Sequence, residues 1–350
     1  MKTKAVIYDG VDQIRIGEVT LPELGPKQIA ATTLFSFVSP GTELRVLGGH
    51  YGAAGRYPVV PGYATVSRVT AVGAEVKGFK VGDMISCRNG AAFTDCGSMW
   101  GGEAGAHVFD TETEDKPVLL PQGLSEEEYL KYSAAEVAAI SLRGVDAADP
   151  KEGETALVIG QGMIGQFSAM WLKARGAKVV VADIDANRLA ESRLAGVSEA
   201  VNLSEPGAED RVARLGNGGY DIVVEASGSI PGVKLAYKSI RVKPQNYSTD
   251  YKVEPIRFYG GNWSRLVMQA NYVKTIEISP FEFFPGEGVT ILTPMDRGVE
   301  ERQRAVEYIR SGKVDVSPFL KKVVKADDMV AYYRKLQNRE IVSLIGDWRA

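Results

Sequence analysis

Three glycines between residues 160 and 165 have the spacing of a phosphate-binding turn. The segment VIGQGMIGQF places Gly160, Gly162 and Gly165 in the pattern G-x-G-x-x-G, after the apolar run TALVIG and at the start of the apolar segment IGQFSAMWLKARG. The first glycine permits a tight turn, the second lets the backbone approach a pyrophosphate, and the third allows close packing of helix on strand. The N–H groups and positive dipole end of the helix favour a phosphate. The pattern therefore predicts a dinucleotide site.

An acidic residue stands where the second strand of such a unit would end. Asp183 lies near the end of AKVVVADID, 18 residues beyond Gly165, close to the spacing of about 20 residues typical of dinucleotide sites. Its carboxylate would bind ribose hydroxyls and repel a 2′-phosphate, which favours NAD over NADP. Arg188 would cover the adenine or face solvent, and the alternative for the whole motif is a glycine turn that binds nothing. We expect cofactor contacts from Gly160, Gly162, Met163, Ile164, Gly165, Asp183, Arg188 and Ser227.

The pattern of predicted elements changes near Leu124. Before it, short strand-like runs alternate with glycine and proline, which indicates a compact β-barrel-like domain. After it, Ser125 and Glu128 form a capping box that starts one or two helices. A strand, a glycine turn, a helix and a second strand follow, which predicts a parallel sheet with a right-handed crossover. The C-terminal tail reads as strand, helix, strand, and we expect its last strand to return to the N-terminal domain.

The amino-acid composition and net charge exclude several classes of protein. The 350 residues are 45% hydrophobic and 24% charged, with a net charge of -3, so we expect a two-domain protein that binds neither nucleic acid nor membrane. The N-terminus lacks the apolar core of a signal peptide, which predicts a cytoplasmic protein. Cys87 and Cys96 are too few for a disulfide framework or a four-thiolate zinc site, and we expect both to be reduced.

With these motifs in view, the chain resembles the medium-chain dehydrogenase/reductase superfamily, in particular its alcohol and polyol dehydrogenases. The resemblance covers almost the whole chain and rests on SPGTE, PVVPGYATVSRVTAVGAEV, FKVGDMIS, GGEAGAHVF, LPQGLSEEE, GETALVIGQGMIG, VVADIDANRLAESRLAG and YDIVVEASG. It implies an α/β fold with a GroES-like β-barrel catalytic domain, residues 1–123 and 297–350. A Rossmann domain with a doubly wound parallel sheet, residues 124–296, would bind NAD.

The sequence departs from the family where zinc-dependent members bind their metal. The cysteine of their C-G-T-D-like motif is replaced by Ser39 or Pro40, and their G-H-E reads Gly62-Tyr63-Ala64. The lobe with four closely spaced cysteines is absent. Because zinc sites need thiolate and imidazole ligands, we expect no metal. The aromatic and polar segment 241–288 is also atypical, and it would be a lengthened loop, part of a subunit interface, or a variation without chemistry.

Without zinc, another group must move the hydroxyl proton. Tyr63 is the first candidate because it replaces a ligand that points at the reacting centre in the family; the alternative is a tyrosine that only fills the vacated space. The resemblance places a proton-relaying hydroxyl at Thr42 and a carboxylate near the metal at Glu136. His50 has a suitable pKa, or it is an ordinary loop residue. Glu43 would be a base or an anchor bonded to backbone.

These residues lead to one principal function and several alternatives. The principal one is a zinc-independent, NAD-dependent oxidoreductase that interconverts a secondary alcohol, of sugar, polyol or cyclitol type, and its ketone. The alternatives are a zinc-free quinone or enoyl reductase, a redox-neutral enzyme that uses bound NAD transiently, and a non-catalytic NAD-binding protein. The partner is a small-molecule substrate, and the resemblance implies a homodimer formed through an edge strand of the Rossmann sheet.

Overall fold

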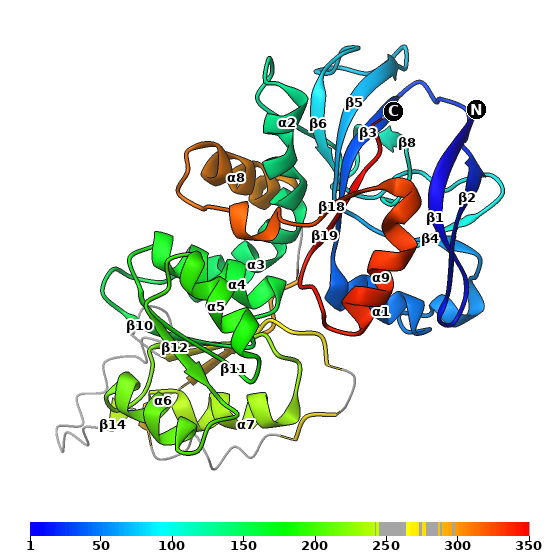
Figure 1. Cartoon of the computed structure of the whole chain (residues 1–350). Helices are drawn as coiled ribbons and strands as arrows, with labels where there is room; N and C mark the ends of the chain where they lie inside the picture. The colour runs from blue at the N-terminus through cyan, green and yellow to red at the C-terminus, as the bar shows by residue number, and fades with distance from the viewer. Residues whose placement is uncertain are drawn as a thin grey trace. The chain divides into compact units, whose positions relative to one another are not determined.

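The computed structural model (Figure 1) describes residues 1–241, 243–244, 264–272, 275–277, 286–287, 289–295 and 298–349. They form two compact units, a terminal unit of Met1–Ile140 with Asp296–Ala350 and a middle unit of Ser141–Met295. The predicted domain boundaries, after residues 123 and 296, stay predictions. Most of the atypical segment 241–288 lies outside the described residues.

The middle unit is built on a parallel sheet. Its described strands follow the order β12-β11-β10-β13-β15-β17, and all neighbours are parallel. In chain order the strands are β10 (Thr155–Ile159), β11 (Lys178–Asp183), β12 (Glu199–Asn202), β13 (Ile222–Glu225), β15 (Ser264–Met268) and β17 (Val289–Leu292). The central strands are almost wholly apolar because helices cover both of their faces. The predicted α/β class and doubly wound parallel sheet are confirmed.

Helices α4 and α5 cover one face of this sheet, and α6 and α7 cover the other (Figure 1). Their bounds are α4 (Met163–Ala174), α5 (Ala186–Leu194), α6 (Ala208–Gly216) and α7 (Ile230–Ser239). The core between α6, α7 and the sheet buries side chains such as Leu157, Val212, Val223 and Leu266. A short antiparallel pair, β14 (Lys243–Pro244) and β16 (Gly286–Glu287), completes the described elements.

The strands of the terminal unit form two sheets. The larger follows β18-β19-β3-β5-β6-β9, with β8 also paired to β3, and the smaller follows β2-β1-β4-β7 among the described strands. The larger contains β3 (Gln28–Val38), β5 (Thr65–Val72), β6 (Met84–Cys87), β8 (Ala106–Asp110), β9 (Val118–Leu119), β18 (Val323–Lys325) and β19 (Leu344–Asp347). The smaller contains β1 (Lys2–Gly10), β2 (Gln13–Thr20), β4 (Val59–Val60) and β7 (Gly97–Ser98).

Strand β3 joins the two ends of the chain. It pairs antiparallel with β19, so the last strand does return to the N-terminal strands, as expected. Two register shifts against β5 let this long strand bend. The unit also contains α1 (Pro40–Leu47), α2 (Glu126–Tyr129), the start of α3 (Ala135–Ala148), α8 (Val299–Arg310) and α9 (Met329–Gln337). The predicted capping box of Ser125 and Glu128 is present at the start of α2.

A buried ionic group ties α8 to α3 and β6. The Arg302 Nε donates to both carboxylate oxygens of Glu136, at 2.9 and 2.7 Å, and its Nη1 donates to the Lys116 carbonyl at 2.8 Å. Ser86 donates to the same carboxylate at 2.9 Å, and the Nε of Arg88 lies 3.2 Å from it. Arg302 and Glu136 are 1% and 0% exposed, so neither charge can be compensated by water.

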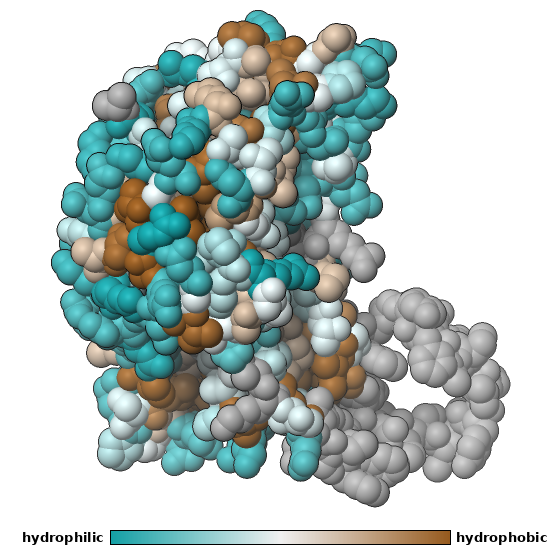
Figure 2. Space-filling view, turned by 90° about the vertical axis from the view of Figure 1, so that its right-hand side faces the viewer, coloured by the Kyte–Doolittle hydropathy of each residue, from teal (hydrophilic) through white to brown (hydrophobic). Residues whose placement is uncertain are grey.

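On the face shown in Figure 2, hydrophilic residues prevail and hydrophobic residues gather in small separate groups. Exposed large apolar side chains include Val81, Ile184, Leu194 and Met295, and scattered residues of this kind are normal. Within the part of the chain that the structure describes, no helix combines the length and apolar character that crossing a bilayer requires.

Replacing Arg302 with methionine should destabilise the protein by about 3 kcal/mol or more, because a carboxylate in the core loses one of its two guanidinium partners. Urea unfolding monitored by circular dichroism measures the change. The control is Arg310→Met on the same helix, where the pair with Glu307 is exposed and its loss should leave the unfolding midpoint nearly unchanged. Equal midpoints for the two variants would contradict the role given to Arg302.

Candidate functional site

The three glycines of the turn after β10 have separate structural environments. Gly160 has a φ of +89°, and a Cβ there would lie 2.5 Å from the backbone nitrogen of Ser227. A Cβ on Gly165 would lie 1.8 Å from the Gly160 carbonyl oxygen, so α4 packs on the turn itself. A Cβ on Gly162 would meet nothing within 4 Å. Two glycines are therefore required by the fold, while Gly162 borders open space that a ligand can fill.

The N-terminus of α4 lacks a side-chain cap. Gly162 occupies the N-cap position with no side-chain hydrogen bond, whereas Asp185 and Ser229 cap α5 and α7 with their own side chains. The first N–H groups of a helix need partners from outside it, and an anion is a favourable one. The turn and the uncapped helix fit a dinucleotide pyrophosphate, with Gly162, Met163 and Ile164 at the open end.

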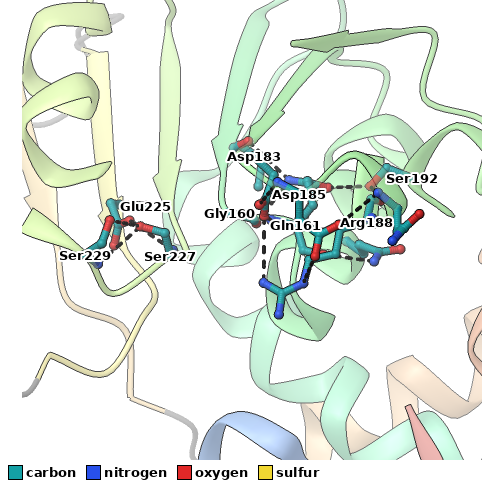
Figure 3. Close-up of polar contacts among 12 residues, drawn as sticks. Gly160, Gln161, Asp183, Asp185, Arg188, Ser192, Glu225, Ser227 and Ser229 are labelled. Atoms are coloured by element: carbon teal, nitrogen blue, oxygen red, sulfur yellow. Dashed lines mark hydrogen bonds and ion pairs between the residues drawn. The ribbon is translucent and has the colours of Figure 1, made fainter. Parts of the chain in front are cut away.

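Asp183 lies at the carboxyl end of β11, beside the glycine turn (Figure 3). Its carboxylate accepts hydrogen bonds from the N–H groups of Gln161 and Asp185. A carboxylate has about four acceptor positions, so capacity remains for ribose hydroxyls. The Arg188 guanidinium lies 4.0 Å from Asp183 Oδ2 and 3.8 Å from Asp185 Oδ2. Arg188 is thus held next to the acidic pair, and its contact with adenine stays a prediction.

Sequence reasoning missed Glu225, which ends β13 and is fully buried. Its carboxylate accepts hydrogen bonds from the N–H and the hydroxyl of Ser227, and from the N–H of Gly228. Tyr272 also donates to it, at 2.5 Å; burial and this carboxylate raise the pKa of the phenol. The network fixes the loop of Ser227, which lies apart from the Asp183 group in Figure 3. An acidic residue closing the apolar strand YDIVVEASG was the available signal.

Tyr63 is a buried tyrosine in the terminal unit. Its hydroxyl donates to Ser39 Oγ at 2.7 Å, and the side chain is buried. Burial raises the pKa of Tyr63 to about 12, although hydrogen bonds with Ser39 and Thr42 and the nearby Arg88 act in the opposite direction. The Arg88 guanidinium carbon lies 6.0 Å from the centre of the phenol ring. At neutral pH this group is therefore a neutral phenol that can donate a proton.

Two buried carboxylates, Glu43 and Glu103, lie close enough to influence each other. Glu43 accepts hydrogen bonds from the Ser39 N–H, at 2.7 Å, and from the Tyr333 hydroxyl. Burial raises the pKa of Glu43 to about 7. Glu103 accepts a hydrogen bond from Ser36 at 2.5 Å, and its pKa is raised by burial and by Glu43. Of the two interpretations offered for Glu43, its contacts match the backbone-bonded anchor.

The remaining candidates have different surroundings. Thr42 lies in the first turn of α1 and is hydrogen-bonded to Tyr63. Glu136 is linked to Tyr63 through Arg88; burial alone would raise the pKa of Glu136, but Arg302 and Arg88 hold it below the usual range. His50 is exposed in the turn after α1. The structure thus joins Tyr63, Thr42 and Glu136 in one cluster, and the catalytic roles remain predictions.

Arg88 and Arg302 were not singled out from the sequence, because nothing local marks either as the partner of Glu136. Burial lowers the pKa of His107, in β8, to about 4, so this histidine is neutral inside the core. Within the described ranges, no group of three or more histidine, cysteine, aspartate or glutamate side chains is arranged to hold a metal ion.

Comparisons with known proteins agree on one kind of fold and chemistry. Residues 164–244 match the sequence model of a family described as zinc-binding dehydrogenase. An alcohol dehydrogenase of Cupriavidus necator is 25% identical, with 96% of this chain and 95% of the relative covered. An L-threonine 3-dehydrogenase of Yersinia pestis is 28% identical, with 85% and 93% covered.

Solved structures show the same fold over nearly the whole chain. The 2R,3R-butanediol dehydrogenase of Bacillus subtilis has a TM-score of 0.80 at 20% identity, with 99% of each chain covered. A Sinorhizobium meliloti protein solved with NADP has a TM-score of 0.79 at 19% identity, also with 99% of each chain covered. An alcohol dehydrogenase of Escherichia coli complexed with NADH has a TM-score of 0.80 at 17% identity and the same coverage. At such identities these structures establish the fold alone.

The surroundings of Gly162 and Gly165 predict that the same substitution affects NAD binding at one position and stability at the other. Gly162→Ala should fold normally, because its φ of -69° suits alanine, but should weaken NAD binding at least tenfold by filling the open space. Gly165→Ala should destabilise the protein by about 1–3 kcal/mol through overpacking. Calorimetric NAD titration and urea unfolding measure the two effects. Unchanged NAD binding by Gly162→Ala would argue against a pyrophosphate at this turn.

Glu43 should make stability depend on pH. Because its folded pKa is raised from 4.5 to about 7, its stabilising contribution is complete below pH 4.5 and is lost as the pH rises through 7. Glu43→Gln should remove this loss. The stability of the variant relative to that of the wild type should therefore increase as the pH rises from 5 to 8. Thermal unfolding across this range measures the difference. Parallel curves for the two proteins would contradict a raised pKa at Glu43.

Proposed function

The chain belongs to the medium-chain dehydrogenase/reductase superfamily, and on that premise we propose that it is a zinc-independent, NAD-dependent oxidoreductase. Its reaction interconverts a secondary alcohol and the corresponding ketone, and the proposed substrates are sugars, polyols or cyclitols. The observation that carries the proposal is the hydrogen-bonded pair of Tyr63 and Ser39, beside the cation of Arg88, at positions where zinc-dependent relatives are expected to bind metal.

The chemistry of this group supports a reaction without zinc. Zinc is held by thiolates, imidazoles and carboxylates, whereas Tyr63 and Ser39 are neutral hydroxyls that bond to each other. Burial keeps Tyr63 protonated, and the guanidinium near its ring disfavours a second cation. These residues do not fit a zinc ion. The family match described as zinc-binding covers residues 164–244 and does not include these positions.

Tyr63 is proposed to handle the proton of the reaction at its phenolic oxygen. When bound, NAD would accept the hydride in alcohol oxidation, and NADH would donate it in ketone reduction. In the direction of ketone reduction, the neutral phenol donates its proton to the substrate oxygen. In the direction of oxidation, the alcohol proton passes to the phenolate, which Thr42 and Arg88 stabilise. Because the pKa of Tyr63 is about 12, oxidation should become faster as the pH rises through the alkaline range.

NAD is the proposed cofactor, supported by the acidic end of β11. The Asp183 carboxylate lies beside the glycine turn, the Asp185 carboxylate caps α5 two residues further on, and a 2′-phosphate would be repelled by both. Arg188 is the one group of this set that would favour NADP, but it already lies next to these carboxylates. The same acidic pair argues against the quinone or enoyl reductase alternative, since that branch commonly uses NADPH.

The proposed assembly is a homodimer formed through β17. Within the described residues this strand pairs only with β15, so one row of its backbone groups is available to another strand. Its Val289 and Leu292 are half-buried, and Ile291 is 40% exposed, as suits an edge that a second copy covers. The cytoplasmic location stays a prediction.

Tyr63→Phe should lower kcat for alcohol oxidation at least 100-fold, because the ring remains but the proton-transferring oxygen is lost. Formation of NADH or NADPH, followed by absorbance with a panel of secondary alcohols, measures the rate and the cofactor preference; NAD should be preferred. The control is Tyr129→Phe, which removes another buried phenol, bonded to the Pro121 carbonyl, and should keep full activity.

Metal analysis of the same samples completes the test. The active enzyme should contain far less than one zinc per chain and should keep its activity with a chelator. Stoichiometric zinc with loss of activity on chelation would overturn the zinc-independent proposal. Full activity of Tyr63→Phe would contradict only the role given to Tyr63, and the zinc-independent proposal would stand.

A further inference from the structure

Two loops of the terminal unit hold an aromatic residue in a left-handed backbone conformation. Tyr51 and Gly52 have φ values of +58° and +72°, and Trp100 and Gly101 have +70° and +73°. Consecutive left-handed residues are normally glycine, asparagine or aspartate, because a larger side chain crowds the backbone. A tyrosine and a tryptophan are therefore unfavourable choices for these turns. Backbone strain of this kind persists mainly at functional sites.

The two side chains meet each other and lead to Tyr63. The rings of Tyr51 and Trp100 are 6.2 Å apart, and those of Trp100 and Tyr63 are 5.7 Å apart, both edge to face. Exposure falls along this row: Tyr51 is 39% exposed, Trp100 is half-buried, and Tyr63 is 6% exposed. The aromatic row thus extends from the surface to the tyrosine whose hydroxyl bonds to Ser39.

We propose that Trp100 and Tyr51 form a platform that binds the apolar face of a ring-shaped substrate and directs one ring hydroxyl toward Tyr63. This inference rests on the proposed function and narrows its substrate class to a cyclic sugar or cyclitol. A ring presents a rigid face of C–H groups that matches an aromatic surface. An open-chain polyol must lose the freedom of several torsions to present the same face.

Trp100 also packs against the buried cluster that includes Val46 and Leu47, so its removal costs packing energy whatever its function. Glycine at position 100 relieves the backbone strain but fills none of that space. A binding role is therefore distinguished by selectivity, because a loss of packing alone lowers the rates with cyclic and open-chain probes alike. The same reasoning applies to Tyr51, whose ring lies at the exposed end of the row.

The test compares wild type, Trp100→Gly and the control Arg339→Gly, which relieves a left-handed residue, φ +61°, outside the aromatic row. NAD-dependent oxidation is measured with cyclic probes (myo-inositol, cyclohexanol) and open-chain probes (mannitol, 2,3-butanediol). Wild type should show a kcat/KM at least tenfold higher for a cyclic probe. Trp100→Gly should lose this advantage, with a larger fall in kcat/KM for the cyclic probe than for the open-chain probe, and Arg339→Gly should behave as wild type.

The platform would be overturned if Trp100→Gly lost kcat/KM equally with cyclic and open-chain probes, or lost none with either. If wild type oxidises none of the alcohols, the proposed function fails, and binding then decides the platform separately. The thermal midpoint of the NAD-loaded protein should rise with myo-inositol but not with mannitol, and this rise should vanish in Trp100→Gly. If the thermal midpoint rose with neither probe, or equally with both, the platform would be overturned independently of turnover.

Discussion

A carboxylate buried between two guanidinium groups is the interaction on which the terminal unit depends. Glu136 cannot be solvated in the core, so Arg302 and Arg88 must both reach it. Arg302 fixes α8 against α3, and Arg88 is held near the ring of Tyr63. A group that resembles a metal-site carboxylate in sequence therefore serves in the structure to position a cation next to the proposed proton donor.

In the middle unit, glycine residues shape the turn after β10 and acidic side chains hold the neighbouring loops. Gly160 and Gly165 are required for the close contact of the turn with Ser227 and with α4, while Gly162 leaves space at an uncapped helix start. Asp183, at the end of β11, accepts hydrogen bonds from the N–H of Gln161 in the glycine turn and from the N–H of Asp185, and Glu225, at the end of β13, bonds to the loop that follows it. Asp183 and Glu225 thus hold the loops around the turn in place, and Asp183 keeps acceptor capacity toward the proposed ribose.

Burial decides the protonation states around Tyr63. The phenol, Glu43 and Glu103 all have raised pKa values because they lie away from water. Glu136 is equally buried, yet its pKa is lowered because two cations face it. Burial therefore favours the neutral forms of Glu43 and Glu103, whereas Arg302 and Arg88 favour the charged form of the equally buried Glu136.

The sequence by itself determined what depends on neighbouring residues: the glycine turn with Asp183, the capping box of Ser125 and Glu128, and the parallel sheet. The replacement of metal ligands at Ser39 or Pro40 and at Tyr63 is an expectation from the sequence. Periodicity and turn chemistry act over a few residues, so they can be read from the chain. Only the tertiary structure decided that Arg302 pairs with Glu136 across 166 residues, that Glu225 anchors the Ser227 loop, and that Tyr51, Trp100 and Tyr63 meet in one row. These contacts depend on where distant segments pack, and no local pattern encodes that.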